Sequence, residues 1–464
     1  MSHLTDPREF YESPLAGRYA GQAMKRLWSL VHQARLWRRL WLWLAEAQQE
    51  LGLEIGDDQL AEMRAHLEDI DLDDIAAREN ELRHDVMAHL HSFGALCPGA
   101  RPILHLGATS AFVQDNADMV RMRDGLGLVR AGLVNVIDAL AAFAREWKDL
   151  PTLGYTHFQP AQPTTVGKRA CLWLQDFVTD LQDLEALLGT LPFRGAKGTT
   201  GTQASYLTLF SGDNERVRQL DRLVTAKAGF ERTADVSGQT LSRKQDARIA
   251  AVLAGVAQSA SKFGNDMRLL QHLGEVEEPF GKSQIGSSAM AYKRNPMRSE
   301  RICALGRFAL GCAQNPGYTA ATQWLERTLD DSANRRLTMA ELFLCIDGIL
   351  QLMLDVARGL VVRPAVVQAN LARQLPFLVT ETLLMEAVKA GGDRQDLHEK
   401  LRVHSQAAAE QVKTGGPNDL LERLRADPDF EAVTGALGAS LDPARFCGRA
   451  AQQVQEFLAE VVEP

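Results

Sequence analysis

Apolar residues recur at alternating intervals of three and four positions over four long stretches of the chain. This spacing places the apolar side chains on one face of an α-helix, as in helical bundles and coiled coils. The stretches run through residues 126–147, 170–191, 256–270 and 339–356, and Arg130 interrupts the first of them. Nothing in the sequence is typical of an alternating array of parallel strands and helices. The pattern predicts an all-α fold with a long central helical bundle.

Polar segments rich in glycine, threonine, serine and proline separate these stretches, at residues 151–165, 193–206, 281–296 and 328–336. Functional side chains often lie on loops that a rigid scaffold holds in place, so we interpret the four segments as loops that carry the chemistry. The length allows several domains. We expect an N-terminal helical domain at 1–110, the bundle at 111–362 and a C-terminal helical domain at 363–464, with Gly359 and Pro364 marking the second boundary.

Composition and charge narrow the class of protein. The 464 residues are 45% hydrophobic and 24% charged, as in an ordinary globular chain. No apolar run approaches the roughly 18 residues of a membrane span, and residues 1–7 lack the apolar stretch of a signal peptide, so we expect a cytoplasmic protein. With 51 basic and 59 acidic residues the net charge is −8. This balance disfavours a general nucleic-acid binder but allows an anionic small substrate.

One segment, residues 286–301, begins with small residues and ends with four basic residues within nine positions. These are Lys293, Arg294, Arg298 and Arg301. Cations and backbone N–H groups together form anion sites, although an exposed basic loop explains the composition equally well. The pair Asn295-Pro296 predicts a helix start with the proline at the first helical position.

Two further segments have the residue types of an active site. The first is Thr156-His157-Phe158-Gln159-Pro160, where His157 precedes a bundle helix. Histidine is a common general acid or base near neutral pH, but a structural histidine bonded to the backbone is the more frequent role. The second is residues 327–336, whose arginines and serine are suited to phosphate. Capping of a helix start by Asp and Ser explains the second segment as well.

Two other kinds of site are disfavoured. The histidines at 84, 89 and 91 lack the i, i+4 spacing of a helical metal pair, and no HExxH occurs, so we predict no metal. In residues 195–202 the glycine and lysine spacing does not match a phosphate-binding P-loop, and no apolar strand precedes it. We therefore reject a P-loop nucleotide hydrolase and expect a tight turn near the active site.

Residues 286–296 resemble the signature loop of the fumarase/aspartase superfamily, which comprises all-α homotetrameric lyases that eliminate fumarate. Five further stretches narrow the resemblance to the adenylosuccinate lyase family and its animal-type branch. They are residues 105–110, 152–162, 197–205, 323–336 and 391–400. The resemblance covers nearly the whole chain, from Ser13 to beyond Ala450. One position departs from the family loop, because Ala291 stands where the family carries proline, and alanine restores φ freedom and an N–H group.

The resemblance implies a β-elimination that releases fumarate from adenylosuccinate, giving AMP, and from the succinylated aminoimidazole carboxamide ribonucleotide, giving AICAR. A base removes the proton next to a carboxylate, and an acid protonates the departing nitrogen. By resemblance Ser287 is the base, ionised with the help of loop N–H groups and Lys293. His157 is the matching acid, with His84 assisting. No metal and no organic cofactor is implied.

The remaining residues implied by the resemblance bind the substrate. Lys293 and Asn295 are expected at the succinyl carboxylates, together with Thr109, Ser110 and Gln239. The phosphate and nucleotide are expected at Arg18, Tyr19, Arg301, Arg327, Ser332 and Arg336, and a further substrate-binding stretch is matched by Arg83, His84 and Asp85. In the family, three subunits of a homotetramer contribute to each site. Two alternatives stay open: another fumarate-releasing lyase such as argininosuccinate lyase, and a non-catalytic structural member of the fold.

Overall fold

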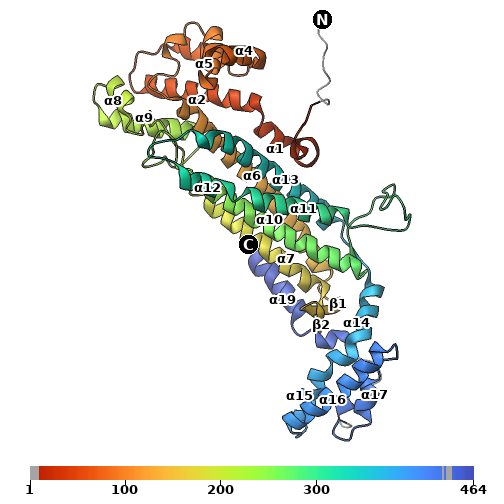
Figure 1. Cartoon of the computed structure of the whole chain (residues 1–464). Helices are drawn as coiled ribbons and strands as arrows, with labels where there is room; N and C mark the ends of the chain where they lie inside the picture. The colour runs from red at the N-terminus through yellow and green to blue at the C-terminus, as the bar shows by residue number, and fades with distance from the viewer. Residues whose placement is uncertain (1–9, 431–432, 435–441, 464) are drawn as a thin grey trace. The chain divides into compact units, whose positions relative to one another are not determined.

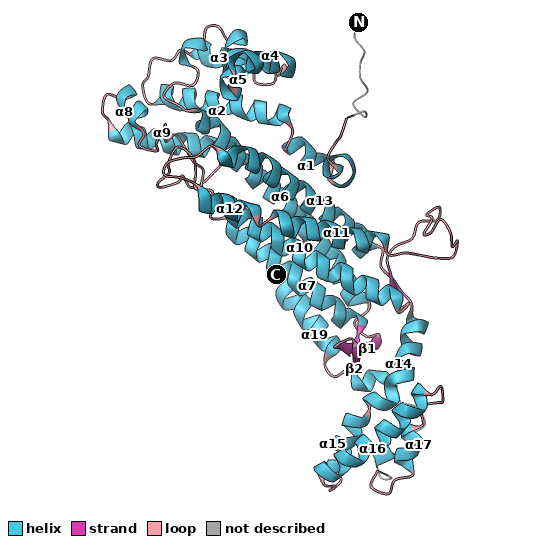
Figure 2. Ribbon diagram, viewed as in Figure 1, coloured by secondary structure: helices cyan, strands magenta, loops and turns pink. Residues whose placement is uncertain are grey.

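A computed structural model describes residues 10–430, 433–434 and 442–463 of the chain, and the expectation for residues 1–7 lies outside this part. Helices dominate the described chain, and only two small two-stranded sheets accompany them (Figures 1 and 2). The predicted all-α class is therefore confirmed.

The elements follow one another along the chain with these bounds. The N-terminal elements are η2 (Leu15–Tyr19), α1 (Gln22–Leu27), α2 (Leu30–Glu50), α3 (Asp57–Ala65), α4 (Leu72–Leu82), α5 (Asp85–Leu96) and η3 (Arg101–Ile103). Next come α6 (Ser110–Glu146), β1 (Pro151–Thr156), β2 (Gln159–Thr165), α7 (Val166–Leu188), α8 (Ala204–Leu209), α9 (Asn214–Lys227), α10 (Lys244–His272) and β3 (Val276–Glu277). The rest are α11 (Met297–Cys312), α12 (Asn315–Thr322), α13 (Asp330–Arg358), β4 (Val361–Val362), α14 (Pro364–Leu378), α15 (Thr380–Lys389), α16 (Arg394–Lys413), α17 (Leu420–Arg425), η4 (Pro443–Phe446), α19 (Ala450–Phe457) and η5 (Leu458–Val462).

The four apolar seams form the four long helices α6, α7, α10 and α13, and their seam residues are buried. Leu133 on α6, Leu174 on α7, Phe263 on α10 and Ile346 on α13 are each fully inaccessible to solvent. Arg130, which interrupts the first seam, points to solvent and pairs with Glu185. The periodicity of the sequence thus located both the helices and their buried faces.

The described chain divides into two compact units that are each discontinuous in sequence. The first comprises residues 1–134, 179–261 and 301–353, and the second comprises 135–178, 262–300 and 354–464. Boundaries between the units fall within the long helices α6, α7, α10 and α13, so each unit contains a part of each of these helices and several shorter elements. The division into three consecutive domains, at 1–110, 111–362 and 363–464, stays a prediction.

In the first unit the helices α6 and α13 pack closely because two glycines face α13. A Cβ atom on Gly125 would lie 2.8 Å from the Phe343 ring, and one on Gly132 would lie 2.9 Å from a methyl group of Leu350. Both distances are shorter than real Cβ contacts allow. The absence of a side chain at these positions therefore brings the two helix backbones together and fixes where the first residues of α13 lie along α6.

In the second unit β1 and β2 form an antiparallel hairpin against which α14 packs. The C-terminal helices α14 to α17 share a separate apolar core that includes Val379, Leu383, Leu401 and Phe430. Strands β3 and β4 form a second short antiparallel pair. The hairpin and the loop after β3 hold the two residues that the sequence suggests as acid and base.

Two helices, α6 and α13, are long and apolar enough to cross a membrane by length and composition alone. The expectation that no stretch approaches this limit was therefore wrong. Core helices of bundles pass the same test, and 44% of the most apolar window of α6 and 56% of that of α13 are buried within this chain. The remaining residues of these windows are partly or fully exposed in the single chain, and they include polar residues such as Arg130 and Asp347 beside apolar ones such as Val134.

Candidate active site

His157 lies at the tip of the β1–β2 hairpin rather than in the irregular loop that the sequence suggested. The strands pair from Pro151 with Thr165 to Thr156 with Gln159, which leaves only His157 and Phe158 as the turn. Both residues have positive φ angles, 52° and 55°, as a type I′ turn requires. Such angles strain residues other than glycine by about 1–3 kcal/mol each, and observed strain of this kind clusters at functional sites.

A buried carboxylate holds the hairpin at the end opposite its turn. Glu275, fully inaccessible, accepts a hydrogen bond from the Thr152 hydroxyl at 3.2 Å and another from the Asn370 amide at 3.1 Å. Arg169 on α7 lies 3.8 Å from Glu275 and donates to the Leu153 carbonyl at 2.5 Å. These contacts fix the base of the hairpin, while the His157 side chain at its tip stays exposed.

Ser287 lies in the loop between β3 and α11, where two backbone N–H groups point at its side chain. The Oγ atom accepts hydrogen bonds from the N–H of Ala289 at 3.3 Å and of Met290 at 3.1 Å. Donors aimed at an oxygen favour its charged form. The geometry therefore suits a serine that must lose its proton, as the sequence suggested for Ser287.

The same loop carries Lys293 and Asn295. The Asn295 amide donates to the Gly286 carbonyl at 2.9 Å, which closes the loop at its base, and the Lys293 side chain is exposed. A Cβ atom on Gly286 would lie 2.0 Å from the Lys293 carbonyl oxygen, so only glycine allows this closure. Lys293, Asn295 and Ser287 are thus held in one small loop.

Helix α11 begins at Met297, one residue after the predicted start, so Pro296 precedes the helix and is not its first residue. The cap of the helix comes from Glu278, the first residue after β3. The buried Glu278 accepts hydrogen bonds from the N–H groups of Arg298 at 3.1 Å and Ser299 at 3.0 Å. A carboxylate at this end of a helix satisfies unpaired N–H groups and favours the helix dipole.

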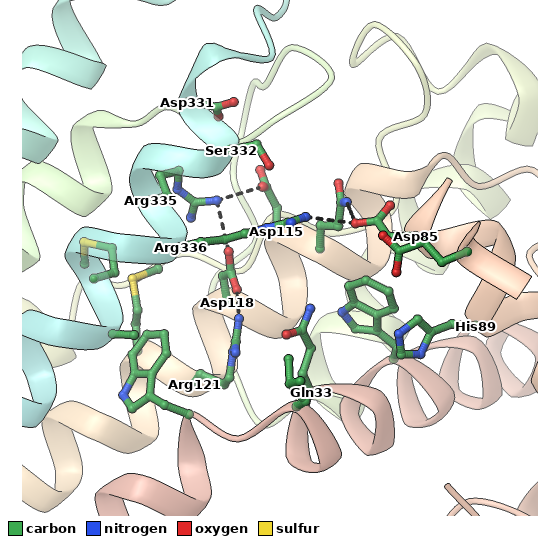
Figure 3. A pocket seen from close by; sticks show the side chains of 18 of the residues that line it. Gln33, Asp85, His89, Asp115, Asp118, Arg121, Asp331, Ser332, Arg335 and Arg336 are labelled. Atoms are coloured by element: carbon green, nitrogen blue, oxygen red, sulfur yellow. Dashed lines mark hydrogen bonds and ion pairs between the residues drawn. The ribbon is translucent and has the colours of Figure 1, made fainter. Parts of the chain in front are cut away.

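In the first unit a cavity of about 370 Å³ brings together four of the expected substrate residues. Arg327, Ser332 and Arg336 line it from α13 and the segment just before it, and Asp85 faces them from the start of α5 (Figure 3). Arg336 and Asp85 form an ion pair at 2.9 Å. The cavity is large enough for a small organic ligand, and it contains the cations that a phosphate requires.

The stretch Arg83-His84-Asp85 forms the turn between α4 and α5. Arg83 has a positive φ of 55°, and His84 caps α5 because its Nδ1 accepts the N–H of Met87 at 3.4 Å. The other ring nitrogen of His84 lies 3.5 Å from the hydroxyl of Ser110, the first residue of α6. Thr109 immediately precedes Ser110. The two stretches expected to bind substrate, residues 83–85 and 109–110, therefore lie beside each other.

Gln239 joins this group through Arg327, whose guanidinium donates to the Gln239 side chain at 3.0 Å. The Gln239 backbone is fixed on both sides. Its N–H donates to the Glu326 carbonyl at 3.0 Å, and its carbonyl accepts from Arg194 at 2.5 Å. Arg194 is fully buried. No pattern in the sequence around it predicts this burial.

The segment 195–202 is a series of tight turns, as the sequence suggested. Gly195, Gly198 and Gly201 all have positive φ angles, and the backbone carbonyl of Ser237 approaches the position where a Cβ on Gly201 would lie. Lys197 is buried and paired with Asp221. A lysine fixed in this way is not available to a phosphate, which agrees with the rejection of a P-loop.

Arg18, Tyr19 and Arg301 form a separate group. Arg18 and Tyr19 end the short π-helix η2, and the Arg301 guanidinium lies 5.8 Å from the centre of the Tyr19 ring. The backbone of Tyr19 packs against Gly348 on α13, where an added Cβ would lie 3.1–3.2 Å from Tyr19 atoms. η2 is therefore fixed near the middle of α13.

The first unit thus keeps the expected nucleotide residues apart. Ser332 and Gly348 are sixteen residues apart on the continuous helix α13, which corresponds to about 24 Å at 1.5 Å per residue. Arg18 and Tyr19, beside Gly348, are not among the residues that line the cavity. Within the described residues no hydrogen bond or ion pair joins His157 to Ser287 either.

Two buried histidines near these residues are neutral: His89, which lines the cavity, and His105. Burial lowers the pKa of His89 to about 4, and burial together with the charge of His84 lowers the pKa of His105 to about 4. Trp41 donates its indole N–H to Nδ1 of His105 at 2.8 Å. Among the described residues no group of three or more His, Cys, Asp or Glu side chains could hold a metal ion.

Comparison with known proteins identifies the family. A family model described as "Lyase" matches residues 29–311, and one described as "Adenylosuccinate lyase C-terminus" matches residues 376–457. The adenylosuccinate lyase of Saccharomyces cerevisiae is 50% identical over 457 residues, covering 97% of this chain and 95% of the yeast protein. The chain belongs to the adenylosuccinate lyase family.

Other adenylosuccinate lyases and a solved structure agree with this membership. The adenylosuccinate lyase of the animal Schistosoma mansoni is 47% identical over 462 residues, covering 99% of this chain and 96% of that protein. The crystal structure of a fumarate lyase from Mesorhizobium sp. BNC1 superposes with a TM-score of 0.82 at 25% identity, covering 97% of this chain and all of that one. The family resemblance inferred from the sequence is confirmed.

Proposed function

We propose that the chain is a C–N lyase that releases fumarate from adenylosuccinate, giving AMP, and from the succinylated aminoimidazole carboxamide ribonucleotide, giving AICAR. The observation that carries the proposal is the 50% identity to an adenylosuccinate lyase over almost the entire length of both chains. Purine nucleotide synthesis is the setting in which these substrates occur.

In the proposed mechanism Ser287 removes the proton from the carbon next to one succinyl carboxylate. The two N–H groups that donate to its Oγ support this role, because they stabilise negative charge on the serine oxygen before the proton is taken. Lys293 and Asn295 bind the succinyl carboxylates from the same loop. The electron pair that remains is delocalised into the carboxylate as an aci-carboxylate, whose extra charge Lys293 offsets.

His157 then protonates the nitrogen as the C–N bond breaks, which yields fumarate and the free amino group of the nucleotide. Its exposed place at a strained two-residue turn supports this role, because the side chain extends away from its own hairpin. Arg327, Ser332 and Arg336 bind the phosphate and nucleotide, with Gln239, Thr109 and Ser110 at the succinyl group. The proposed mechanism uses neither a metal ion nor an organic cofactor.

We further propose that the active chain is a homotetramer in which different subunits complete each site. Two observations support this. Arg18 and Tyr19 lie beside Gly348, about 24 Å along α13 from Ser332, and neither residue lines the cavity that holds Ser332 and Arg336. The most apolar windows of α6 and α13 are only 44% and 56% buried in the single chain, so part of each long helix is available to pack against another subunit.

A substrate panel tests the proposed activity. Purified protein is mixed with adenylosuccinate, the succinylated imidazole carboxamide ribonucleotide or argininosuccinate, and fumarate release is followed by absorbance. We expect turnover of the first two and none of the third. Release from argininosuccinate alone would replace the proposal with the other lyase, and release from none would support a non-catalytic member of the fold.

A further inference from the structure

A cluster of largely buried charged side chains forms part of the wall of the cavity that holds Ser332 and Arg336. Its acidic members Asp115, Asp246 and Asp331 are 1–3% exposed, and Arg243 is 4% exposed. The side chains of Arg335 and Asp118 are 11% and 20% exposed. None of these residues is among the expected substrate residues. We call the six the buried ion cluster: Asp115, Asp118, Arg243, Asp246, Asp331 and Arg335.

Asp115 on α6 is the centre of the cluster. Its carboxylate accepts hydrogen bonds from the backbone N–H of Leu241 at 2.6 Å and from the Arg243 guanidinium at 3.0 Å, and Arg335 lies 3.7 Å away. One carboxylate therefore joins three parts of the chain: α6, the segment that leads into α10, and the start of α13.

The remaining contacts fix the first two turns of α13. Arg243 donates from Nε to Asp331 at 2.6 Å. Arg335, one helical turn further along, donates to Asp246 at 2.6 Å and pairs with Asp118 at 3.0 Å. Figure 3 shows Arg335 between the two carboxylates of α6, Asp115 and Asp118. Two points one turn apart determine both the position of the helix and its rotation about its axis.

The substrate residues lie directly beside these anchors. Ser332 follows Asp331 and Arg336 follows Arg335, so the two pairs form adjacent stripes on α13. All four side chains line the cavity, and those of Asp331 and Arg335 are the more buried. Gln239 lies two residues before Leu241, whose N–H Asp115 holds. A rotation or shift of either anchored segment would therefore move Gln239, Ser332 and Arg336.

The shifted pKa values of Asp115 and Arg335 favour the charged forms of these two residues in the folded protein. Burial alone would raise the pKa of Asp115, but Arg243 and Arg335 outweigh burial and hold that pKa below its ordinary value. Burial alone would lower the pKa of Arg335, but the carboxylates of Asp246, Asp118 and Asp115 outweigh burial and raise that pKa above its ordinary value. Buried ion pairs contribute little stability compared with apolar side chains of the same volume. Their directional contacts, in contrast, fix geometry that apolar packing leaves free.

We propose that Asp115 is a positioning residue for nucleotide binding, which holds Gln239, Ser332 and Arg336 in place through Leu241, Arg243 and Arg335. The inference rests on the proposed function, because it takes Ser332 and Arg336 as ligands of the nucleotide and Gln239 as a ligand of the succinyl group. Asp115 itself lines the cavity, but the role assigned to it acts through Leu241, Arg243 and Arg335 and includes no part in proton transfer.

The variant Asp115→Asn tests the inference. Asparagine keeps the shape and an acceptor for Leu241 but removes the charge that holds the two arginines. A misplacement on the order of 1 Å can weaken a site by about 100-fold, so we expect the KM for adenylosuccinate and the Kd for AMP to rise by about 10- to 100-fold. Because Ser287 and His157 are untouched, kcat should change by much less than KM.

Asp266→Asn is the matched control. Asp266 on α10 accepts the Trp173 indole N–H at 2.7 Å and pairs with Lys262 at 2.8 Å, and it contacts none of the expected substrate residues. We expect its KM and AMP affinity to equal those of the wild type. The Asp266 side chain is 34% exposed, so the comparison separates the loss of a hydrogen-bonded, ion-paired carboxylate elsewhere in the chain from the loss of this particular carboxylate.

The kinetic split distinguishes positioning from a purely structural role. If Asp115 only stabilised the fold, Asp115→Asn would reduce the fraction of active protein and hence the apparent kcat, while KM and the AMP Kd of the folded fraction stayed at wild-type values. That result would overturn the inference. A wild-type chain that neither releases fumarate nor binds AMP would overturn the proposed function and this inference with it.

Arg335→Lys provides the test if Asp115→Asn does not fold. Lysine keeps the positive charge but lacks the planar fork that reaches Asp246 and Asp118 together. The same rise in KM and AMP Kd with nearly unchanged kcat supports the inference. An AMP Kd equal to that of the wild type overturns it.

Discussion

Acidification should unfold this protein partly through His105, whose neutral ring is built into the fold. The Trp41 indole donates to Nδ1 of His105 at 2.8 Å, so Nδ1 must carry no proton. Burial, together with the charge of His84, lowers the pKa of His105 to about 4 from an ordinary value of 6.5. The unfolded chain therefore binds this proton at a higher pH than the folded chain does.

The sign and size of the effect follow from this difference. Between pH 6.5 and pH 4 the unfolded state binds more protons at His105, so the free energy of unfolding falls as the pH falls through this window. Above pH 7 this histidine makes no contribution to the pH dependence. A shift from 6.5 to about 4 corresponds to about 3.5 kcal/mol at about 1.4 kcal/mol per pKa unit. Most of it, about 2.5 kcal/mol, is already lost by about pH 4.5.

The variant His105→Asn isolates this contribution. The backbone at His105 has a φ of +63°, which asparagine tolerates better than most residues, and asparagine does not titrate. Urea unfolding of both proteins is followed by circular dichroism at a fixed protein concentration from pH 7.5 to 4.5. We expect the variant to lose about 2–3 kcal/mol less than the wild type over this range. Equal losses would show that His105 is not buried in its neutral form, and His89, which remains in both proteins, cancels in the comparison.

Three further predictions concern the reaction. Ser287→Ala should lower kcat by about 100-fold or more while AMP affinity by calorimetry stays unchanged, and a kcat near the wild-type value would assign the base to another residue. His157→Ala should also be nearly inactive alone but regain part of its activity when refolded with Ser287→Ala, and mixed tetramers without activity would place both residues in one subunit's site. Ala291→Pro should alter kcat through loop mobility without changing the substrate used, and a changed substrate preference in the panel assay would contradict this.

The helical architecture could be predicted because it depends on periodicity. Residues such as Leu174 and Ile346 repeat at helical spacing, and burial of that face is what holds a bundle together. The hairpin escaped prediction because β2 contains Pro160 and Pro163, which usually exclude a strand. A two-stranded ribbon tolerates them, since each strand has one unpaired edge where no N–H is required.

The candidate site was predictable only where a family motif marks it. The loop around Ser287 and the turn around His157 are recognised from their residues, but their local geometry is not. The charged residues Asp115 and Arg243 are indistinguishable in the sequence from surface residues. Their burial depends on long-range contacts, between α6, the start of α10 and α13, that no local pattern encodes. Arg194 and Glu275 went unnoticed for the same reason.

The most direct test of the account is the simultaneous measurement of both products from adenylosuccinate. The purified chain is incubated with the substrate, and AMP and fumarate are quantified by chromatography over time, with Ser287→Ala as the control. The account predicts that the wild-type chain forms AMP and fumarate in equal amounts and that the variant forms almost none. Absence of either product from the wild-type reaction, or equal yields from wild type and variant, would contradict it.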